Sequence, residues 1–247
     1  MARKSIADWI RRALKDRRSR RQSLSVWVME DLGLGYVALP KAASSAIRNL
    51  IRDREGQRIF ADRELDRASL KMQVEKRVKH SLTPSEARAF GRNVRLFSFV
   101  RNPLTRLHSC YRDKVVNAAQ KHERCTLGVY GIEFGMSFDE FVTQVSSIPD
   151  ERADQHFRSQ HTFLTHDDQL LVHFLGRFER FDEDWRRLGE EYGLPQPGRD
   201  HRVSGPPVSA QQLPLKRASA ERAVQRYRRD IELFDYHQEI EQVLERL

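Results

Sequence analysis

Two stretches of the chain share one arrangement of apolar and polar residues: a short apolar run, a turn with proline, and a segment with helical spacing. The first runs from Tyr36 to Ile51 and breaks at Pro40. The second runs from Phe97 to Arg112 and breaks at Pro103. After each turn, apolar residues recur three and four positions apart, which is typical of one buried helix face. Each stretch therefore predicts a strand, a loop and a helix.

The first turn carries residues suited to an anion-binding loop, namely Lys41, Ala42, Ala43, Ser44 and Ser45. A loop that enters a helix presents unpaired backbone N–H groups and the positive end of the helix dipole. The lysine adds a full charge, the alanines let a ligand approach the backbone, and the serine hydroxyls can cap the helix or donate to ligand oxygens. An ordinary capped helix after a strand also explains these residues, because the glycine-rich phosphate-loop pattern is absent.

The second turn adds a further cationic group at the end of a strand. Arg101 directly follows the apolar run, and the apolar positions of the next segment form one helix face that leaves Arg101 and Ser109 available. In an open parallel sheet, ligands bind at the carboxyl ends of the strands, where Lys41 and Arg101 would both lie. Two such points suit a ligand with two separated anionic groups.

In order and spacing, these motifs resemble a known family. The sequence P-K-x-x-S-S, followed about sixty residues later by F-V-R-N-P-L-x-R-L-x-S-x-Y-R, resembles the two cofactor motifs of the sulfotransferases, and in detail the carbohydrate sulfotransferases that include chondroitin 4-O-sulfotransferase. The family's usual second motif is V-R-[DE]-P-F-x-R-L-x-S-A-Y-R-x-K-F, from which Asn102, Leu104 and Cys110 depart conservatively. The likeness covers roughly residues 25 to 236 and continues through 137–142, 154–157, 175–179 and 227–236.

The resemblance implies a soluble, bacterial-type member with an α/β fold: three layers, P-loop-like, with a central, mainly parallel sheet flanked by helices. It implies 3′-phosphoadenosine 5′-phosphosulfate as the sulfuryl donor, with no metal. Lys41 and the loop from Ala42 to Ser45 would hold the 5′-phosphosulfate, and Lys41 would also neutralise charge at the bridging oxygen. Arg101 and Ser109 would hold the 3′-phosphate. Arg106 would either contact the donor or form a salt bridge within the fold.

The catalytic base has two candidates. His156 lies in the segment that matches the family's N-E-H-W sequence, and Asp154 precedes it as an orienting group. An imidazole with a near-neutral pKa is a natural acceptor for a hydroxyl proton. His80 is the rival, because a histidine between the two cofactor motifs resembles the base of the related uronyl 2-O-sulfotransferases. His156 could instead only brace its loop.

Composition limits the location and the chemistry. The 247 residues are 39% hydrophobic and 32% charged, and they suit one α/β domain with a full core. No run of 18 apolar residues predicts a membrane span, and the N-terminus lacks the apolar core of a signal peptide. Two cysteines, Cys110 in a buried helix and Cys125 in a loop, are too few for a disulfide framework. We therefore expect a cytoplasmic protein without a metal site.

The net charge of +9 is concentrated at the N-terminus. Residues 1–23 contain nine Lys or Arg against two Asp, and Ile6, Trp9, Ile10 and Leu14 share one helix face. This basic amphipathic extension would precede a single domain at 24–247. It is typical of a solvated helix, of a peripheral membrane contact or of a nucleic-acid-binding tail.

Local signals predict most of the remaining elements. In the first half, the expected features are a hairpin from Ser25 into the Tyr36 strand, charged surface helices and loops at 52–77, a helix capped by Thr83, a strand at 94–100 and a mobile loop at 114–136. In the second half, they are a helix from Ser137, a strand at 170–175, a helix at 181–192 ending at Gly193, a loop at 195–207, and one or two helices at 218–247.

Three function classes compete. A sulfotransferase that acts on a carbohydrate hydroxyl, as in polysaccharide biosynthesis, is favoured by the motifs. A nucleotide kinase is disfavoured, because the sequence lacks both the glycine-rich loop and an evident magnesium-binding carboxylate at a strand end. A nucleic-acid-binding protein could use the basic tail, but we expect no nucleic-acid partner.

Overall fold

The computed structural model describes residues 23–61, 66–198 and 209–247, so the basic extension lies outside the described residues. The chain divides into two compact units. The first consists of the residues up to Leu39 together with Ala43–Phe99 and Phe163–His201. The second consists of Pro40–Ala42, Val100–Thr162 and Arg202–Leu247. Each unit is described by itself.

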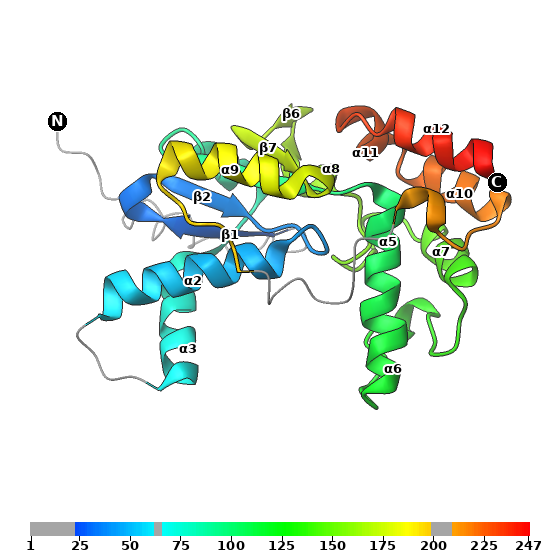
Figure 1. Ribbon diagram of the computed structural model, residues 1–247, viewed down its shortest axis with the longest axis horizontal. Coiled ribbons are helices and arrows are strands. Elements are labelled where there is room, and N and C mark those ends of the chain that lie inside the picture. The colour runs from blue at the N-terminus through cyan, green and yellow to red at the C-terminus, as the bar shows by residue number, and fades with distance from the viewer. Residues whose placement is uncertain (1–22, 62–65, 199–208) are drawn as a thin grey trace. The chain divides into compact units, whose positions relative to one another are not determined.

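The first unit is built around a five-stranded sheet with the strand order β3-β1-β2-β4-β7 (Figure 1). The strands are β1 (Leu24–Met29), β2 (Leu34–Val37), β3 (Lys79–Leu82), β4 (Arg95–Val100) and β7 (Phe174–Arg177). β2 pairs parallel with β4, and β1 pairs antiparallel with both β2 and β3. β2, β3 and β4 thus run in one direction and β1 in the other. A short hairpin is formed by β5 (Thr165–His166) and β6 (Gln169–Leu170).

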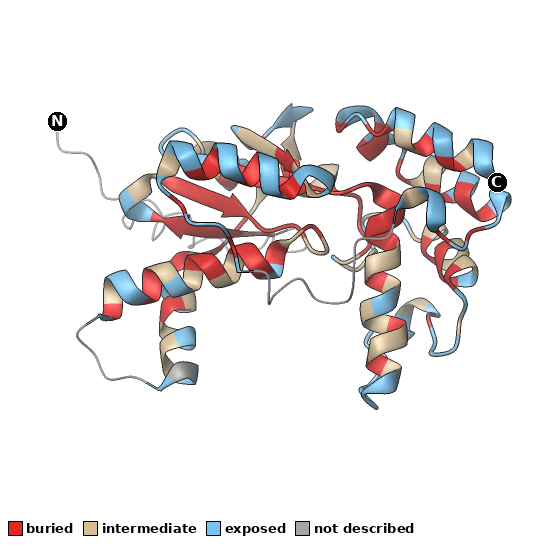
Figure 2. Ribbon diagram, in the orientation of Figure 1, coloured by how far each residue is buried: buried red, intermediate tan, exposed pale blue. Residues whose placement is uncertain are grey.

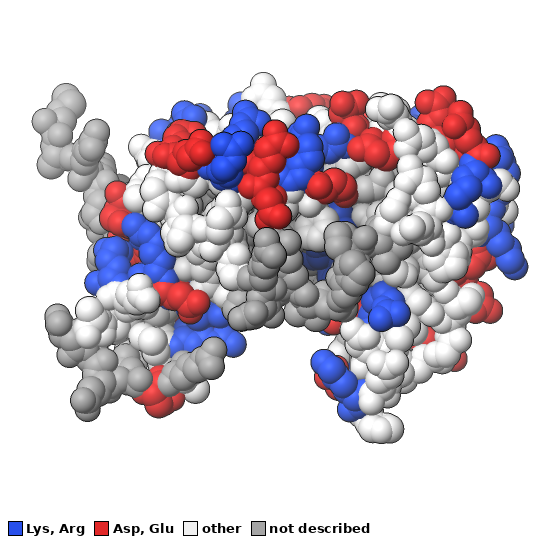
Figure 3. Space-filling view, viewed as in Figure 1, with Lys and Arg blue, Asp and Glu red and all other residues white. Residues whose placement is uncertain are grey.

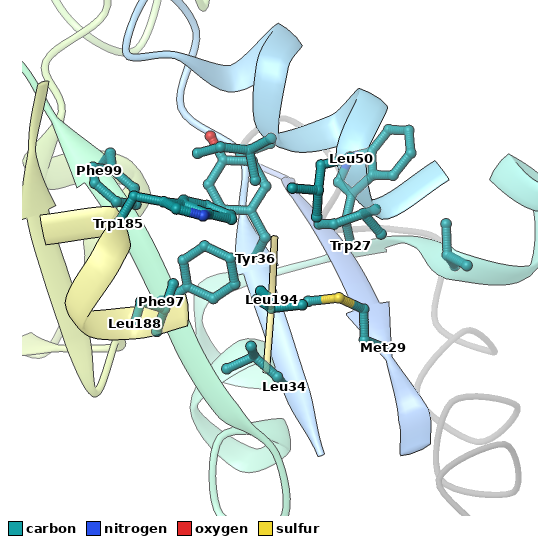
Figure 4. Packing of buried hydrophobic residues seen from close by; sticks show 14 of the residues in the cluster. Trp27, Met29, Leu34, Tyr36, Leu50, Phe97, Phe99, Trp185, Leu188 and Leu194 are labelled. Atoms are coloured by element: carbon teal, nitrogen blue, oxygen red, sulfur yellow. The ribbon is translucent and has the colours of Figure 1, made fainter. Parts of the chain in front are cut away.

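One face of this sheet carries an aromatic core. Trp27, Tyr36 and Phe97 lie side by side on three adjacent strands, because the register pairs Trp27 with Tyr36 and Tyr36 with Phe97. Phe99 stacks on Trp185 of helix α9 with ring centroids 6.0 Å apart, and Figure 4 shows these rings together. Three helices bury apolar residues in the same cluster, namely α2 (Ser44–Phe60), α3 (Arg67–Val78) and α9 (Phe181–Tyr192).

The opposite face packs closely around a glycine. Val26, Val37 and Leu96 are fully buried there, and a Cβ atom at Gly35 would lie 2.8 Å from the Leu96 side chain. Helix α4 (Pro84–Phe90) ends beside Leu96, since a Cβ at Gly91 would contact it at 3.5 Å. The predicted α/β fold, with a central and mainly parallel sheet flanked by helices, is therefore confirmed.

The second unit is mainly helical. Its helices are α5 (Pro103–Tyr111), a π-helix (Arg112–Asn117), α6 (Ala118–Gln120), α7 (Phe138–Ser146), α10 (Arg217–Arg226), α11 (Arg228–Leu233) and α12 (His237–Arg246). α8 (His161–Leu164) leads back to the first unit. The apolar faces of α7 and α10 meet, and Figure 2 shows the alternation of buried and exposed residues along these helices. The Tyr111 hydroxyl donates to the Met136 carbonyl at 2.8 Å and ties α5 to the segment before α7.

Helices with explicit capping signals match their predictions. Thr83 and Glu86 form a capping box at α4, and Ser137 and Glu140 form another at α7. α9 ends at Gly193, whose φ of 65° is left-handed as expected for a terminating glycine. The β1–β2 hairpin is also confirmed.

The helices expected within the charged stretch 52–77 are present as the end of α2 and as α3, although Phe60 and Val74 are buried. Other expectations were wrong. The strand β3 was not predicted. Lys114–Gln120 is helical rather than part of a loop, because no glycine or proline interrupts it. The expected strand at 170–175 is divided: Gln169–Leu170 pairs with β5, whereas Phe174–Arg177 joins the main sheet.

Candidate active site

Lys41 and Arg101 lie together in the second unit. The Arg101 guanidinium donates from Nη1 to the Lys41 backbone carbonyl at 3.2 Å and from Nε to the Thr105 hydroxyl at 3.1 Å. The Arg101 side chain is 8% exposed. The cation that follows β4 therefore lies against the backbone of the lysine-bearing turn, so the structure brings together these two predicted site residues.

A side-chain amide fixes the end of β4. The Gln160 carboxamide accepts from the Arg101 backbone N–H at 2.9 Å and donates to the Arg101 carbonyl at 2.7 Å. This two-point pairing imitates a neighbouring strand. Asp230 on α11 in turn accepts from the Gln160 backbone N–H at 2.7 Å and from His161 Nδ1 at 2.8 Å. Since Gln160 and Asp230 are both fully buried, the backbone of Arg101 is held rigidly.

The turn after Arg101 is organised by Asn102. Its side-chain oxygen accepts from the backbone N–H groups of Leu104 and Thr105 at 3.0 and 3.3 Å, and Pro103 occupies the first position of α5. Asparagine caps helices as well as aspartate does, which explains why the departure from the family's acidic residue preserves the turn.

The lysine ammonium has a carboxylate partner. Lys41 Nζ lies 3.1 Å from Asp113 Oδ2, and Lys114 Nζ lies 3.3 Å from the same oxygen. Burial opposes ionisation of Asp113, but the charges of Lys41 and Lys114 outweigh it and lower its pKa. Asp113 is therefore ionised at neutral pH and sits between two ammonium groups.

Arg106 connects three parts of the second unit. It is 1% exposed, and it donates to the carbonyls of Pro40 at 3.0 Å, Gln155 at 3.1 Å and Arg158 at 2.8 Å. One partner precedes Lys41 and the other two flank His156. Of the two roles expected for Arg106, the structure supports the one within the fold, although its partners are backbone carbonyls rather than a carboxylate.

His156 forms a pair with Asp154. His156 Nδ1 lies 2.6 Å from Asp154 Oδ1, which also accepts from the His156 backbone N–H at 2.9 Å. Burial opposes ionisation of Asp154, but the hydrogen bonds from His156 lower its pKa overall. An ionised carboxylate at Nδ1 favours the tautomer that carries its proton there. The Nε2 lone pair is then the ring's proton acceptor.

Several of these charged groups act on the buried thiol of Cys110. Burial raises the pKa of Cys110 to about 12, and the charges of Lys41, Arg106, Asp154 and Asp113 all act on it. Lys114, which contacts Asp113, also acts on Asp154. Charges from the lysine turn and from the Asp154–His156 pair therefore act electrostatically on the same buried side chain of α5.

The backbone of the first motif is left-handed at two residues without being glycine. Lys41 has a φ of 69° and Ala43 a φ of 60°. In the first unit, Ala43 is the residue before α2, and neither serine hydroxyl caps that helix. Ser44 is the first helical residue, and the exposed Ser45 hydroxyl accepts from Arg48 Nη2 at 3.4 Å. Of the two roles expected for the serine hydroxyls, the helix cap is contradicted, because left-handed Ala43 precedes the helix, while donation to ligand oxygens stays a prediction.

The other predicted residues occupy distinct places. Ala42 is fully buried, and Ser109 is half-buried on α5. His80 lies on β3 in the first unit, where it is 9% exposed and its Nε2 has no hydrogen-bond partner among the described residues. Burial lowers the pKa of His80, so this imidazole is neutral at pH 7.

Sequence reasoning missed Asp113, Gln160 and Asp230. Asp113 comes directly after the second motif, so its position was a signal that could have found it. Gln160 and Asp230 carry no local signal, because their roles depend on contacts 59 and 70 residues away along the chain.

On the face shown in Figure 3, basic and acidic side chains of the described residues are interspersed. Figure 3 shows Lys and Arg interspersed with Asp and Glu over α9, where Arg186 pairs with Glu190 at 3.1 Å. Within residues 23–61, 66–198 and 209–247, no three His, Cys, Asp or Glu side chains are grouped closely enough to hold a metal ion. In the same ranges, no helix is long and apolar enough to cross a membrane.

Comparison with known proteins gives a match to a family model but none to an individual protein. No curated protein and no solved structure matches the chain. The model of the sulfotransferase family, however, matches residues 25–237 and so includes both cationic turns, the Asp154–His156 pair and Asp230. The chain therefore belongs to the sulfotransferase family.

Proposed function

We propose that this sulfotransferase moves a sulfuryl group from 3′-phosphoadenosine 5′-phosphosulfate to a hydroxyl group of a carbohydrate. The observation that carries the proposal is the contact between the Arg101 guanidinium and the Lys41 backbone at 3.2 Å. It joins the guanidinium of one cationic turn to the backbone of the other, sixty residues apart along the chain. A nucleotide with anionic groups at both ends of its ribose suits two such cations better than a ligand with one phosphate.

The roles of the residues follow from their chemistry. Lys41 would bind the 5′-phosphosulfate and offset the charge that develops on the bridging oxygen. The following residues, Ala42 to Ser45, would add backbone N–H groups and hydroxyls, a prediction that rests on their adjacency to Lys41 in the sequence. Arg101 would bind the 3′-phosphate through its guanidinium, together with the Ser109 hydroxyl. When bound, the donor supplies the sulfuryl group and leaves as adenosine 3′,5′-bisphosphate.

His156 is the proposed base. Its Nδ1 is held by Asp154, so Nε2 accepts the proton of the acceptor hydroxyl while the hydroxyl oxygen bonds to sulfur. Asp154 thereby orients the ring and stabilises the imidazolium that forms. His80 remains the alternative. Its buried Nε2 is a proton acceptor without a partner among the described residues, but no carboxylate is found at its ring to orient it.

The acceptor is proposed to be a glycan, glycolipid or polysaccharide precursor. This part of the proposal rests on the likeness of the second motif, through Arg101, Arg106 and Ser109, to the carbohydrate sulfotransferases.

Titration with adenosine 3′,5′-bisphosphate tests the donor site. We expect a dissociation constant of roughly micromolar order, and a loss of about 100-fold or more in Lys41→Ala and in Arg101→Gln. Exposed Lys121→Ala and Arg222→Ala, in the same unit, are matched controls that should bind normally. Unchanged binding in both site variants would overturn the proposal.

Turnover tests the base and the acceptor. His156→Ala should retain donor affinity while transfer of labelled sulfate to an oligosaccharide panel falls by about 100- to 10,000-fold. If transfer persists in His156→Ala but is lost in His80→Ala, the base is His80. If every oligosaccharide is inert while other hydroxyl compounds accept sulfate, the carbohydrate assignment is wrong.

A further inference from the structure

A carboxylate contacts the lysine of the proposed anion site. Asp113 Oδ2 lies 3.1 Å from Lys41 Nζ, the group that should bind the donor's 5′ end. The side chains of Lys41 and Asp113 are 17% and 33% exposed, so the pair is partly shielded from water. An ionised carboxylate is a poor neighbour for a phosphosulfate, because like charges at contact distance repel.

The backbone conformation that follows α5 orients this carboxylate. Asp113 belongs to the π-helix at Arg112–Asn117, which directly continues α5 after Tyr111. A π-helix has one more residue between hydrogen-bonded groups than an α-helix, and such turns shift the direction of side chains at functional sites. The extra residue sets the direction in which Asp113 points, toward Lys41 on the neighbouring loop.

A second lysine lets the pair exchange partners. Lys114 Nζ lies 3.3 Å from the same Asp113 oxygen that Lys41 contacts. If the Lys41 ammonium turns to another anion, Asp113 keeps a counter-ion and is not left as an unpaired charge. The usual penalty for breaking a partly buried ion pair is thereby reduced.

We propose that Asp113 is an internal competitor that holds the Lys41 ammonium until the donor's 5′ group displaces it, with Lys114 taking over the carboxylate. This inference rests on the proposed function, because it assumes that Lys41 binds the donor. Asp113 then weakens the site for nucleotides with a 5′ anionic group. In doing so, it fixes the position of the Lys41 side chain through their 3.1 Å contact while the site is empty.

Comparing two nucleotides, with and without a 5′ anionic group, distinguishes competition for Lys41 from a general effect of the Asp113 charge. Calorimetric titration would compare adenosine 3′,5′-bisphosphate with adenosine 3′-monophosphate, which lacks the 5′ group. We expect Asp113→Asn to bind the bisphosphate about three- to tenfold more tightly than the wild type, as for loss of a partly exposed ion pair. Binding of the monophosphate should be unchanged, because that ligand does not need Lys41.

Control variants make the result decisive. Glu241→Gln, at an exposed position on α12, changes the net charge equally and should leave both affinities unchanged. Asp113→Ser removes the carboxylate differently and should act in the same direction as Asp113→Asn. Circular dichroism would confirm that each variant is folded.

Several outcomes would overturn the inference. Weaker or equal binding of the bisphosphate by Asp113→Asn would show that Asp113 positions Lys41 or is passive. If Asp113→Asn bound both nucleotides more tightly by the same factor, Asp113 would act only through its negative charge and not through Lys41. In either case the donor site itself would stand, provided that the wild type binds the bisphosphate and Lys41→Ala does not. If the wild type binds neither nucleotide, the proposed function fails and this role fails with it.

Discussion

The interiors of the two units are built from different chemistry. The core of the first unit is an apolar cluster in which Phe97, Phe99, Phe181 and Trp185 contact one another. The second unit also has an apolar core, but it buries a group of charged and amide side chains beside it. These residues are Arg101, Asn102, Arg106, Arg158, Gln160 and Asp230.

The two interiors contribute differently, one mainly to the stability of the fold and the other to the positions of individual polar groups. Apolar contacts are non-directional, so the aromatic cluster of the first unit stabilises the sheet without fixing individual polar atoms, which buried Ser98 and Asp184 do elsewhere in that unit. Buried hydrogen bonds are directional and costly to leave unmade, so the second unit fixes particular carbonyls and N–H groups. The groups fixed in this way belong to Arg101 and to the residues beside Lys41 and His156.

The largest expected effect comes from truncating the apolar core. Trp185→Ala removes an indole that contacts three aromatic rings, and it should lower the free energy of unfolding by about 3–5 kcal/mol. Urea unfolding measures this loss, and Trp185→Phe should cost less because the ring packing is largely kept. Donor affinity of the folded protein should not change. If affinity falls as strongly as stability, the division between the two interiors is wrong.

Arg106→Met should have a smaller effect on stability and a larger one on binding. Methionine keeps much of the volume but leaves the carbonyls of Pro40, Gln155 and Arg158 without their donor. We expect a loss of about 2–3 kcal/mol in unfolding free energy, together with at least about tenfold weaker binding of adenosine 3′,5′-bisphosphate. Arg222→Met on α10 is the exposed control. Normal binding by Arg106→Met would show that this residue has only a packing role.

The smallest effect concerns His80, a buried polar group in the first unit. Burial lowers its pKa below the ordinary 6.5, so its neutral form favours the folded state. That contribution is complete above pH 6.5 and is lost as the pH falls through this value toward the lower folded-state pKa. Between pH 7 and pH 5 the wild type should therefore lose more stability than His80→Leu, as measured by urea unfolding at each pH. Parallel pH profiles for the two proteins would show that His80 is not buried as neutral imidazole.

Features with local chemical signals were predictable from the sequence. Thr83 and Ser137 mark the starts of their helices through capping boxes, and Gly193 marks the end of α9. Lys41 and Arg101 were predicted to lie at the carboxyl ends of parallel strands, and the Arg101 guanidinium does contact the Lys41 backbone there. The pairing of Asp154 with His156 was predicted from their spacing of two residues and is observed.

Features that depend on distant partners were not predictable. β3 is a short strand, and its register is set by β1, more than fifty residues earlier. Gln160 resembles any polar loop residue until its amide is seen to pair with the Arg101 backbone. Arg106 was ambiguous for the same reason, because its three carbonyl partners come from segments that the sequence does not place side by side.

The π-helix constrains the length of the chain as well as its composition. Removing one residue from Arg112–Asn117 would allow this segment to relax into ordinary α-helix, in which each residue turns the chain by about 100°. Because a π-helix fits an extra residue into one turn, the segments before and after the deletion would keep nearly their present orientation, but the side chains within the segment would turn, and the carboxylate would leave the ammonium it now contacts. Single substitutions in this segment can therefore preserve the contact between the carboxylate and the ammonium, whereas a single deletion breaks it.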